Sequence, residues 1–328
     1  MKIETSVTRL LGIDLPILQA GMSWASSNAA LPLAVSRAGG LGVIAAGPMR
    51  LDALEEAIDT IRAGTDRPFA VNMPLYRKGA EDLLDLLEAK RIPILIASQG
   101  GPQKYLDRFR AVGTICLHVV ASELHAVKAA EKGVDGLIVV GGEAGGHPPA
   151  DLVSTLVLVR AVAKATEGRI PLVASGGFAD GQGLASALAL GAGAANFGTR
   201  FIATPEAGVV DGYKQAVIGA GVADTRTVGR GFGMIRTLSN DFAEEMAALE
   251  RAAAPDDQRR ETFAASTLKM AAFDGDMRRG KLEAGQSAGL VSRIMPAAEI
   301  VAEIARDYVV CVRSLPQPVP TNAPQPAL

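Results

Sequence analysis

Residues 172–199 read LVASGGFADGQGLASALALGAGAANFGT and contain one complete strand–helix–strand unit. An apolar run at Leu172–Ala174 precedes a glycine turn, a helical pattern over Gly183–Leu190 and a second apolar run at Ala194–Phe197. Neither run alternates with polar residues, which is typical of parallel strands buried on both faces of a sheet. This stretch therefore predicts a parallel α/β architecture.

The same unit recurs along the N-terminal part of the chain. Six further apolar runs predict strands, at residues 16–19, 41–45, 69–72, 94–98, 115–120 and 136–140. Helical patterns lie between most of them, over residues 51–63, 80–90, 103–112, 122–132 and 153–166. Eight strand–helix units within about 200 residues predict a TIM (β/α)8 barrel. An open doubly wound sheet is the alternative.

The regular pattern stops after Phe201. The block 219–285 is polar and helical, and we interpret it as a helical insertion after strand eight that forms a lid or substrate wall over the barrel. A surface extension without a role is the alternative. We therefore divide the chain into a barrel, residues 1–218, that a final helix within 286–313 closes, the insertion at 219–285 and a proline-rich tail at 314–328.

Composition narrows the classes of function. The chain has 328 residues, with 33 Lys and Arg against 35 Asp and Glu, so its charge gives no sign of nucleic acid or an anionic membrane as partner. Two cysteines and three histidines favour neither a disulfide scaffold nor a metal centre. No signal peptide or membrane span is expected, so we expect a cytoplasmic protein with a small-molecule substrate. The oligomeric state stays open, with a homodimer as one option.

The loops after the strands predict where a ligand binds, because TIM barrels form their sites there. Glycines gather in these loops. Ser175, Gly176 and Gly177 follow strand seven, and Gly198 and Thr199 follow strand eight, where backbone N–H groups often hold a phosphate. Tight turns are the alternative. The pattern G-x-G-x-x-A at 40–45 is not a dinucleotide fingerprint, because it runs into a strand instead of leaving one.

His147 is the candidate catalytic residue. It ends the glycine-rich loop after strand six, where an imidazole can exchange a proton with a ligand near neutral pH. A loop-stabilising histidine is the alternative. His118 lies within a strand pattern, where it is packed or supports the site indirectly, and His125 lies on a helix as a surface residue. Glu143 is a base, a hydrogen-bonding partner of the ligand or a solvated loop acid.

Five motifs, in the same order along the chain, resemble the nitronate monooxygenase (2-nitropropane dioxygenase) family, which includes the FMN-dependent enoyl-acyl-carrier-protein (ACP) reductases of the second type. They are QAGM at 19–22, VN at 71–72, EAGGH at 143–147, ASGGFADG at 174–181 and GTRF at 198–201. The resemblance runs from about Leu10 to Asp307. It is specific for the family and less specific for the reaction.

The resemblance implies an FMN barrel and a role for each matching residue. His147 matches the active-site histidine. The other residues would bind FMN: Gly21, Met22 and Asn72 near the ring, Glu143 and Gly146 at its flank, Ser175, Gly176, Gly177, Gly198 and Thr199 around the phosphate, and in addition Ala20 and Gln99. The leading interpretation is oxidation of alkyl nitronates or nitroalkanes by O2. An NAD(P)H-dependent enoyl-ACP, enoyl-CoA or quinone reductase is the alternative, and a non-catalytic FMN-binding protein is a third.

Two features bear on that choice. Some family members carry a lysine after strand five, where a cation stabilises anionic flavin, and this chain has Val119 there. The segments 274–276 and 284–291 look most like the enoyl reductases, whereas 72–76 and 98–101 differ from them. The sequence therefore leaves the substrate and the preferred nicotinamide open.

Overall fold

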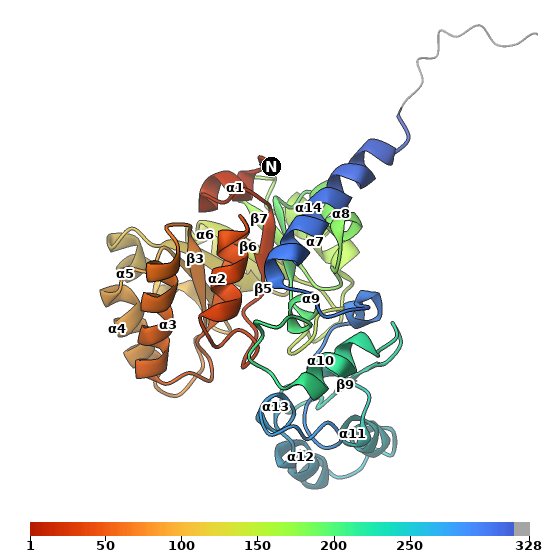
Figure 1. Cartoon of the computed structure of the whole chain (residues 1–328). Coiled ribbons are helices and arrows are strands. Elements are labelled where there is room, and N and C mark those ends of the chain that lie inside the picture. The colour runs from red at the N-terminus through yellow and green to blue at the C-terminus, as the bar shows by residue number, and fades with distance from the viewer. Residues whose placement is uncertain (318–328) are drawn as a thin grey trace, which may run out of the picture.

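The computed structural model describes residues 1–317 and shows eight parallel strands around a closed barrel (Figure 1). The strands are β1 (Ile17–Gln19), β2 (Gly42–Ala45), β3 (Phe69–Pro74), β4 (Ile94–Ser98), β5 (Ile115–Val120), β6 (Gly136–Val140), β7 (Leu172–Ser175) and β8 (Ala194–Phe197). Their order is β1-β8-β7-β6-β5-β4-β3-β2, and a parallel bridge between Leu18 and Leu41 joins β1 to β2. The predicted TIM barrel is confirmed, and the open sheet is excluded.

One side chain completes the seam between β1 and β2. Gln19 is fully buried, and its Oε1 accepts from the Val43 backbone N–H at 3.0 Å. Its Nε2 donates to the Val43 carbonyl at 3.2 Å. The amide thus satisfies the backbone groups that a longer strand pair would have bonded. This closure fixes the loop after β1, which begins at Ala20.

Helices cover the outside of the barrel, and all of them except the one at Ala30–Arg37 were predicted from the sequence. They are α2 (Ala30–Arg37), α3 (Leu51–Gly64), α4 (Ala80–Ala89), α5 (Leu106–Ala111), α6 (Glu123–Glu131), α7 (Thr155–Ala165), α8 (Gly181–Ala189) and α14 (Ala297–Ser314), with a 3-10 turn at Pro102–Lys104. The final helix, α14, packs against α8 and α2 and therefore closes the ring. The short α1 (Ser6–Leu11) buries Val7 and Leu11 at the amino-terminal end of the barrel.

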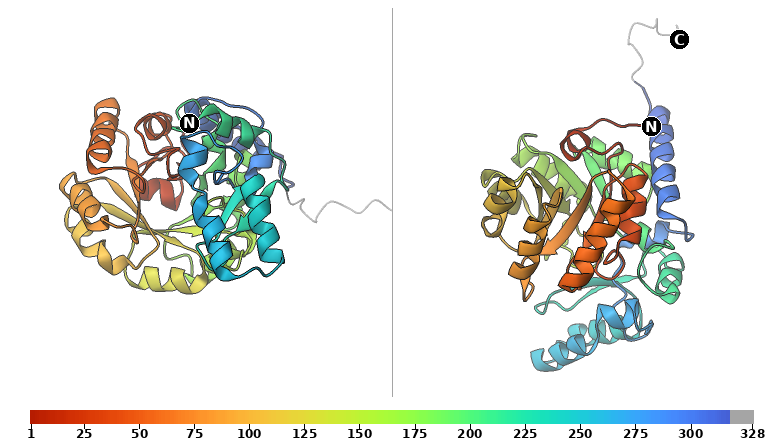
Figure 2. Two further views of the ribbon diagram at one scale, coloured as in Figure 1. Left: turned by 90° about the horizontal axis from the view of Figure 1, so that it is seen from below. Right: turned by 60° about the vertical axis from the view of Figure 1, so that its left-hand side comes forward.

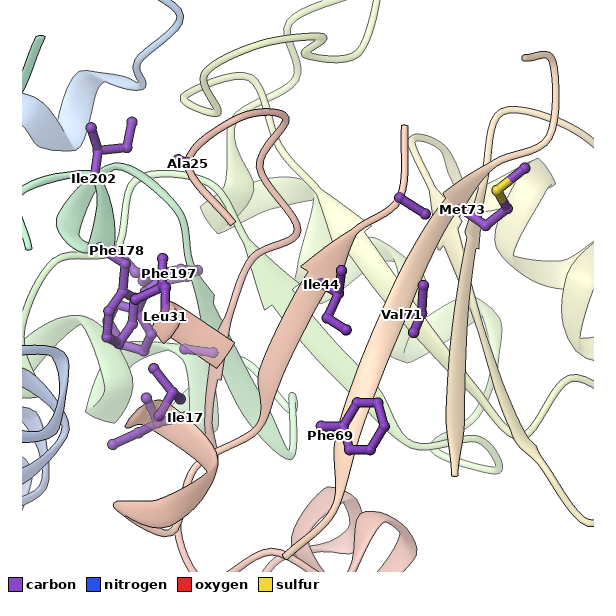
Figure 3. Packing of buried hydrophobic residues seen from close by; sticks show 14 of the residues in the cluster. Ile17, Ala25, Leu31, Ile44, Phe69, Val71, Met73, Phe178, Phe197 and Ile202 are labelled. Carbon is purple, nitrogen blue, oxygen red and sulfur yellow. The ribbon is translucent and has the colours of Figure 1, made fainter. Parts of the chain in front are cut away.

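Two hydrophobic layers stabilise this arrangement. Inside the barrel, Leu18, Val43, Leu117 and their neighbours pack against one another. Outside it, alternate residues of the same strands pack against the helices, and Figure 3 shows Ile44 and Val71 among them. Phe178 and Phe197 meet edge to face beside Leu31, with ring centroids 6.4 Å apart. The loops after β7 and β8 therefore start from a rigid layer.

The block after strand eight is not purely helical. It follows α9 (Thr199–Ile202) and α10 (Asp211–Ile218) and contains a hairpin of β9 (Thr225–Val228) and β10 (Ile235–Leu238), then α11 (Asp241–Arg251), α12 (Asp256–Ala265) and α13 (Leu268–Ala272). The sequence analysis missed the hairpin because its four-residue strands, TRTV and IRTL, carry few apolar residues. The block lies at the end of the barrel opposite α1 and over one side of the ring (Figures 1 and 2).

Two smaller findings complete the fold. Residues 318–328 of the predicted tail lie outside the described residues, and α14 ends at Ser314. Among residues 1–317, no helix combines the length and apolar character that crossing a bilayer requires.

Candidate active site

The carboxyl ends of the strands open into one cavity of about 1070 Å³. All thirteen residues that the sequence analysis selected line it, namely Ala20, Gly21, Met22, Asn72, Gln99, Glu143, Gly146, His147, Ser175, Gly176, Gly177, Gly198 and Thr199. The cavity thus brings together residues that are far apart in the sequence, from the loop after the first strand to the loop after the last. What they bind stays a prediction.

The loops after β7 and β8 form an anion cradle. The backbone N–H groups of Gly176, Gly177, Gly198 and Thr199 have no acceptor within residues 1–317. Gly176 and Gly177 have φ angles of 109° and 84°, which only glycine adopts without strain. Several unpaired N–H groups at the edge of a cavity suit a phosphate. The cradle therefore fits the phosphate of FMN.

Replacing Gly198 with leucine should lower FMN occupancy without unfolding the protein. A Cβ at Gly198 would lie 3.7 Å from the nearest atoms, on Ala20 and Met22, so the change fits sterically while its side chain enters the cavity. Flavin absorbance per protein after reconstitution measures the effect. Gly212→Leu, at an exposed glycine in α10, is the matched control. Equal FMN content in the two variants would show that the phosphate binds elsewhere.

The loop after β1 touches strand β3 where Gly21 meets Asn72. A Cβ on Gly21 would lie 2.5 Å from the Cβ of Asn72, so only glycine permits this approach. Asn72 Nδ2 donates to the Ile96 carbonyl at 3.1 Å, which holds the amide in place. Val119 packs with the residues inside the barrel and also lines the cavity. Val119 therefore presents an uncharged side chain to the cavity at this position of β5.

The loop after β6 ends in His147 and packs against the start of α7 at Gly141. Cβ atoms on Gly141 or Gly142 would overlap Thr155 and Leu152, so these glycines let the loop pack tightly there. The His147 side chain is exposed to solvent within the cavity. Desolvation by the surrounding protein, and secondarily the positive charge of Lys281, lower the pKa of the imidazole. At neutral pH the ring is therefore uncharged and able to accept a proton.

Glu143 is held by the N-terminus of α7. Its Oε2 accepts from the Thr155 backbone N–H at 2.8 Å and from the Thr155 hydroxyl at 2.6 Å, and Oε1 accepts from the Ser154 hydroxyl at 2.9 Å. Burial opposes the charge, but these hydrogen bonds outweigh it and lower the pKa of Glu143. The carboxylate stays ionised at neutral pH. This geometry favours an orienting role over that of a base.

The other two histidines also reach the cavity wall. His118 is buried on β5, and its Nδ1 lies 2.9 Å from the Tyr105 hydroxyl. Burial lowers the pKa of His118, so it packs in the wall as a neutral ring. His125 is exposed on α6, as predicted, and it lines the outer part of the cavity together with Lys128 and Lys132.

The insertion contributes residues that sequence reasoning missed. Leu268, Glu283 and Gly285 line the cavity, as do Tyr213 from α10 and Ser287 just after the insertion. Gly285 N–H donates to Thr199 Oγ1 at 2.9 Å, which connects this segment to the anion cradle. The resemblance at 284–291 was the available signal, but it began one residue too late to include Glu283.

An eight-stranded parallel barrel whose strand ends open into one cavity, with His147 among the lining residues, is the architecture of a TIM-barrel enzyme. The family model described as nitronate monooxygenase matches residues 4–90 and 78–307. The chain therefore belongs to the nitronate monooxygenase family. It is an oxidoreductase of this family, which is typically flavin-dependent.

Three relatives illustrate the range of activities. The (3aS,4S,5R,7aS)-5-hydroxy-7a-methyl-1-oxo-octahydro-1H-indene-4-carboxyl-CoA dehydrogenase of Mycobacterium tuberculosis is 32% identical over 94% of this chain and 97% of that protein. A nitronate monooxygenase of Paraburkholderia phytofirmans is 32% identical over 94% of this chain and 96% of its own. The structure of FabK from Thermotoga maritima shares 39% identity with a TM-score of 0.89, covering 95% of this chain and 98% of that one.

Proposed function

We propose that this protein is an FMN-dependent oxidoreductase that reduces a carbon–carbon double bond in an acyl thioester, with NAD(P)H as co-substrate. The observation that carries this proposal is the size of the cavity. Its volume of about 1070 Å³ slightly exceeds the roughly 300–1,000 Å³ common for drug-sized ligands. It therefore has room for FMN and for a substrate much larger than a small nitroalkane.

The outer wall of the cavity suits an anionic carrier. Lys128 and Lys132 line the cavity together with Glu131 and His125, so the two ammonium groups there outnumber the single carboxylate. Coenzyme A and the prosthetic arm of an acyl carrier protein both carry phosphate groups, which lysine binds well. The dehydrogenase of M. tuberculosis is named for a CoA thioester. The size of the cavity, its lysine side chains and this relative all favour a thioester of coenzyme A or of an acyl carrier protein as the substrate.

The residues of this chain divide the work between binding and proton control. The N–H groups after β7 and β8 would hold the FMN phosphate, and Gly21 and Asn72 would border the ring. FMN, when bound, supplies the two-electron chemistry that connects the nicotinamide to the substrate. Neutral His147 can donate its ring N–H to an oxygen on which negative charge develops.

Oxidation of nitronates or nitroalkanes is the second candidate, and the state of His147 favours it. A neutral imidazole at the cavity mouth can take the acidic proton of a nitroalkane. The nitronate monooxygenase of P. phytofirmans supports this activity. The choice between the two candidates depends on which compound reduces the flavin.

Anaerobic reduction of the purified yellow protein separates the candidates. We expect NADH or NADPH to bleach the flavin and an enoyl thioester to restore its colour, because the cavity accommodates the larger substrate. The flavin released on denaturation should be FMN. If a nitronate bleaches the flavin while neither nicotinamide does, nitronate oxidation replaces the reductase proposal. Identification of FAD, or failure to bind any flavin on reconstitution, would contradict both.

A further inference from the structure

Glu283 brings a second ionisable side chain to the cavity that contains His147. It lies between α13 and the 3-10 turn Gln286–Leu290, and it lines the cavity wall. Its Oε2 lies 3.2 Å from the point where a Cβ on Gly146 would stand, so the carboxyl group borders the residue before His147. Neither a hydrogen bond nor an ion pair holds this carboxyl group within the part of the chain that the structure describes.

The backbone around Glu283 is held from three sides. The Tyr213 hydroxyl donates to the Glu283 carbonyl at 2.8 Å. Two residues further along the chain, Gly285 N–H donates to Thr199 Oγ1 at 2.9 Å. The next residue, Gln286, donates its N–H to the Glu143 carbonyl at 3.0 Å. A carboxyl group on such a fixed backbone, without a partner of its own among residues 1–317, is placed to act on a ligand.

Charged or titratable groups approach Glu283 from each element packed around it. Lys281 precedes it on the same segment, Tyr213 comes from α10, and His147 shares the cavity from the loop after β6. Arg236 of β10 pairs with Gly146 but directs its guanidinium to the Gly142 carbonyl at 2.7 Å. Burial raises the pKa of Glu283 to about 7, and Lys281 opposes this only in part. Burial also raises the pKa of Tyr213, which therefore stays neutral.

We propose that Glu283 exchanges a proton with the substrate, alongside His147. This step rests on the proposed reductase function. Once hydride has reached the β-carbon of the enoyl thioester, the resulting enolate needs a proton at its α-carbon. The O–H bond of the Glu283 carboxyl group breaks and a C–H bond forms there, which leaves a carboxylate that water in the cavity reprotonates. At neutral pH the His147 imidazole is uncharged, and its N–H is much less acidic than the O–H of a carboxylic acid. The Glu283 carboxyl group is therefore the better proton donor to the enolate.

Glu283→Gln tests the proposal, because glutamine keeps the size and polarity of the side chain but does not exchange a proton. We expect NAD(P)H to reduce the flavin within about 2-fold of the wild-type rate. The enoyl-dependent step should slow by about 10²–10⁴-fold. The wild-type rate of that step should fall as pH rises through about 7, where Glu283 loses its proton, and the variant should lack this limb. Glu56→Gln, on the exposed face of α3, is the control.

A second measurement on the purified protein needs no substrate. Because the folded state raises the pKa of Glu283, this side chain contributes stability below its unfolded pKa and loses that contribution as pH rises through about 7. The melting temperature of Glu283→Gln, minus that of wild type, should therefore increase between pH 5 and 8. A difference that does not change with pH, or an unchanged pH–rate profile in Glu283→Gln, overturns the proposal.

The two proposals fail in different ways. If neither nicotinamide reduces the wild-type flavin, the reductase function is wrong. The pH–rate profile is then measured with the nitroalkane that wild type oxidises, where Glu283 would accept the α-proton as a carboxylate. The activity of wild type should in that case rise through about pH 7, and Glu283→Gln should lose this rise. If the pH–rate profile of Glu283→Gln matches that of wild type, Glu283 takes no part in proton transfer and only forms part of the cavity wall.

Discussion

His147→Ala should lose about 10²–10⁴-fold in turnover while it remains yellow. His147 lines the cavity mouth and makes no contribution to the anion cradle, so its loss should affect rate more than flavin content. Desolvation lowers the pKa of its imidazole, so the proton-accepting form predominates from a lower pH than in an ordinary histidine. Stopped-flow measurement of each half-reaction, with FMN content determined in parallel, checks this expectation.

The substrate profile of the same variant separates the two candidate reactions. A preformed nitronate has already lost its proton, so its oxidation should suffer much less than that of the neutral nitroalkane. An enoyl thioester should still suffer, because it loses the ring N–H that would stabilise the enolate oxygen. Reduction of the flavin by NAD(P)H should persist. Full activity of His147→Ala on every substrate that wild type accepts would show that the histidine is structural.

The barrel could be predicted from the sequence because its strands carry an unusually simple signal. Runs such as ILIAS at 94–98 and GLIVV at 136–140 are buried on both faces, so uninterrupted apolar residues mark them. Glycine marked the loops, since Gly21, Gly141 and Gly176 stand where a Cβ would collide with a neighbouring segment. Two of these glycines, Gly21 and Gly176, also line the cavity, because close backbone approach occurs at the site itself.

The insertion could not be predicted to the same depth. Its hairpin is short, and Arg236 is buried only because its guanidinium donates to the Gly142 carbonyl and to Thr225. A buried arginine looks like a surface residue in a sequence. Glu283 was missed for a related reason, since Tyr213 and Gly146 approach it only in the folded chain.

The insertion and the loop that ends in His147 form one unit. β10 pairs with the loop through Gly146 and Arg236, whose backbone N–H groups donate to each other's carbonyls at 3.2 and 2.7 Å. On the other side, the segment that contains Glu283 packs against Gly145. The insertion therefore does more than cover the barrel, because it fixes the loop that ends in His147. Removing residues 219–285 as a block would disturb this loop and the contact with Thr199.

Gly145→Ala tests this coupling. A Cβ at Gly145 would lie 2.5 Å from the carbonyl carbon of Ala284 and from the Gly285 nitrogen, and backbone atoms at that distance must move. The shift should displace His147 and Glu283 together, so we expect turnover to fall at least as far as in His147→Ala, by about 10²–10⁴-fold. Overpacking typically costs about 1–3 kcal/mol, so the melting temperature should drop by a few degrees.

Gly212→Ala is the matched control, because it adds the same methyl group at the exposed glycine of α10. The nearest atom to a Cβ there is 3.5 Å away, on the flexible side chain of Met277, which is an ordinary van der Waals contact. Alanine also suits a helix better than glycine does, so this variant should keep wild-type turnover and should not lose stability. Wild-type kinetics in Gly145→Ala would show instead that the loop and the insertion act independently.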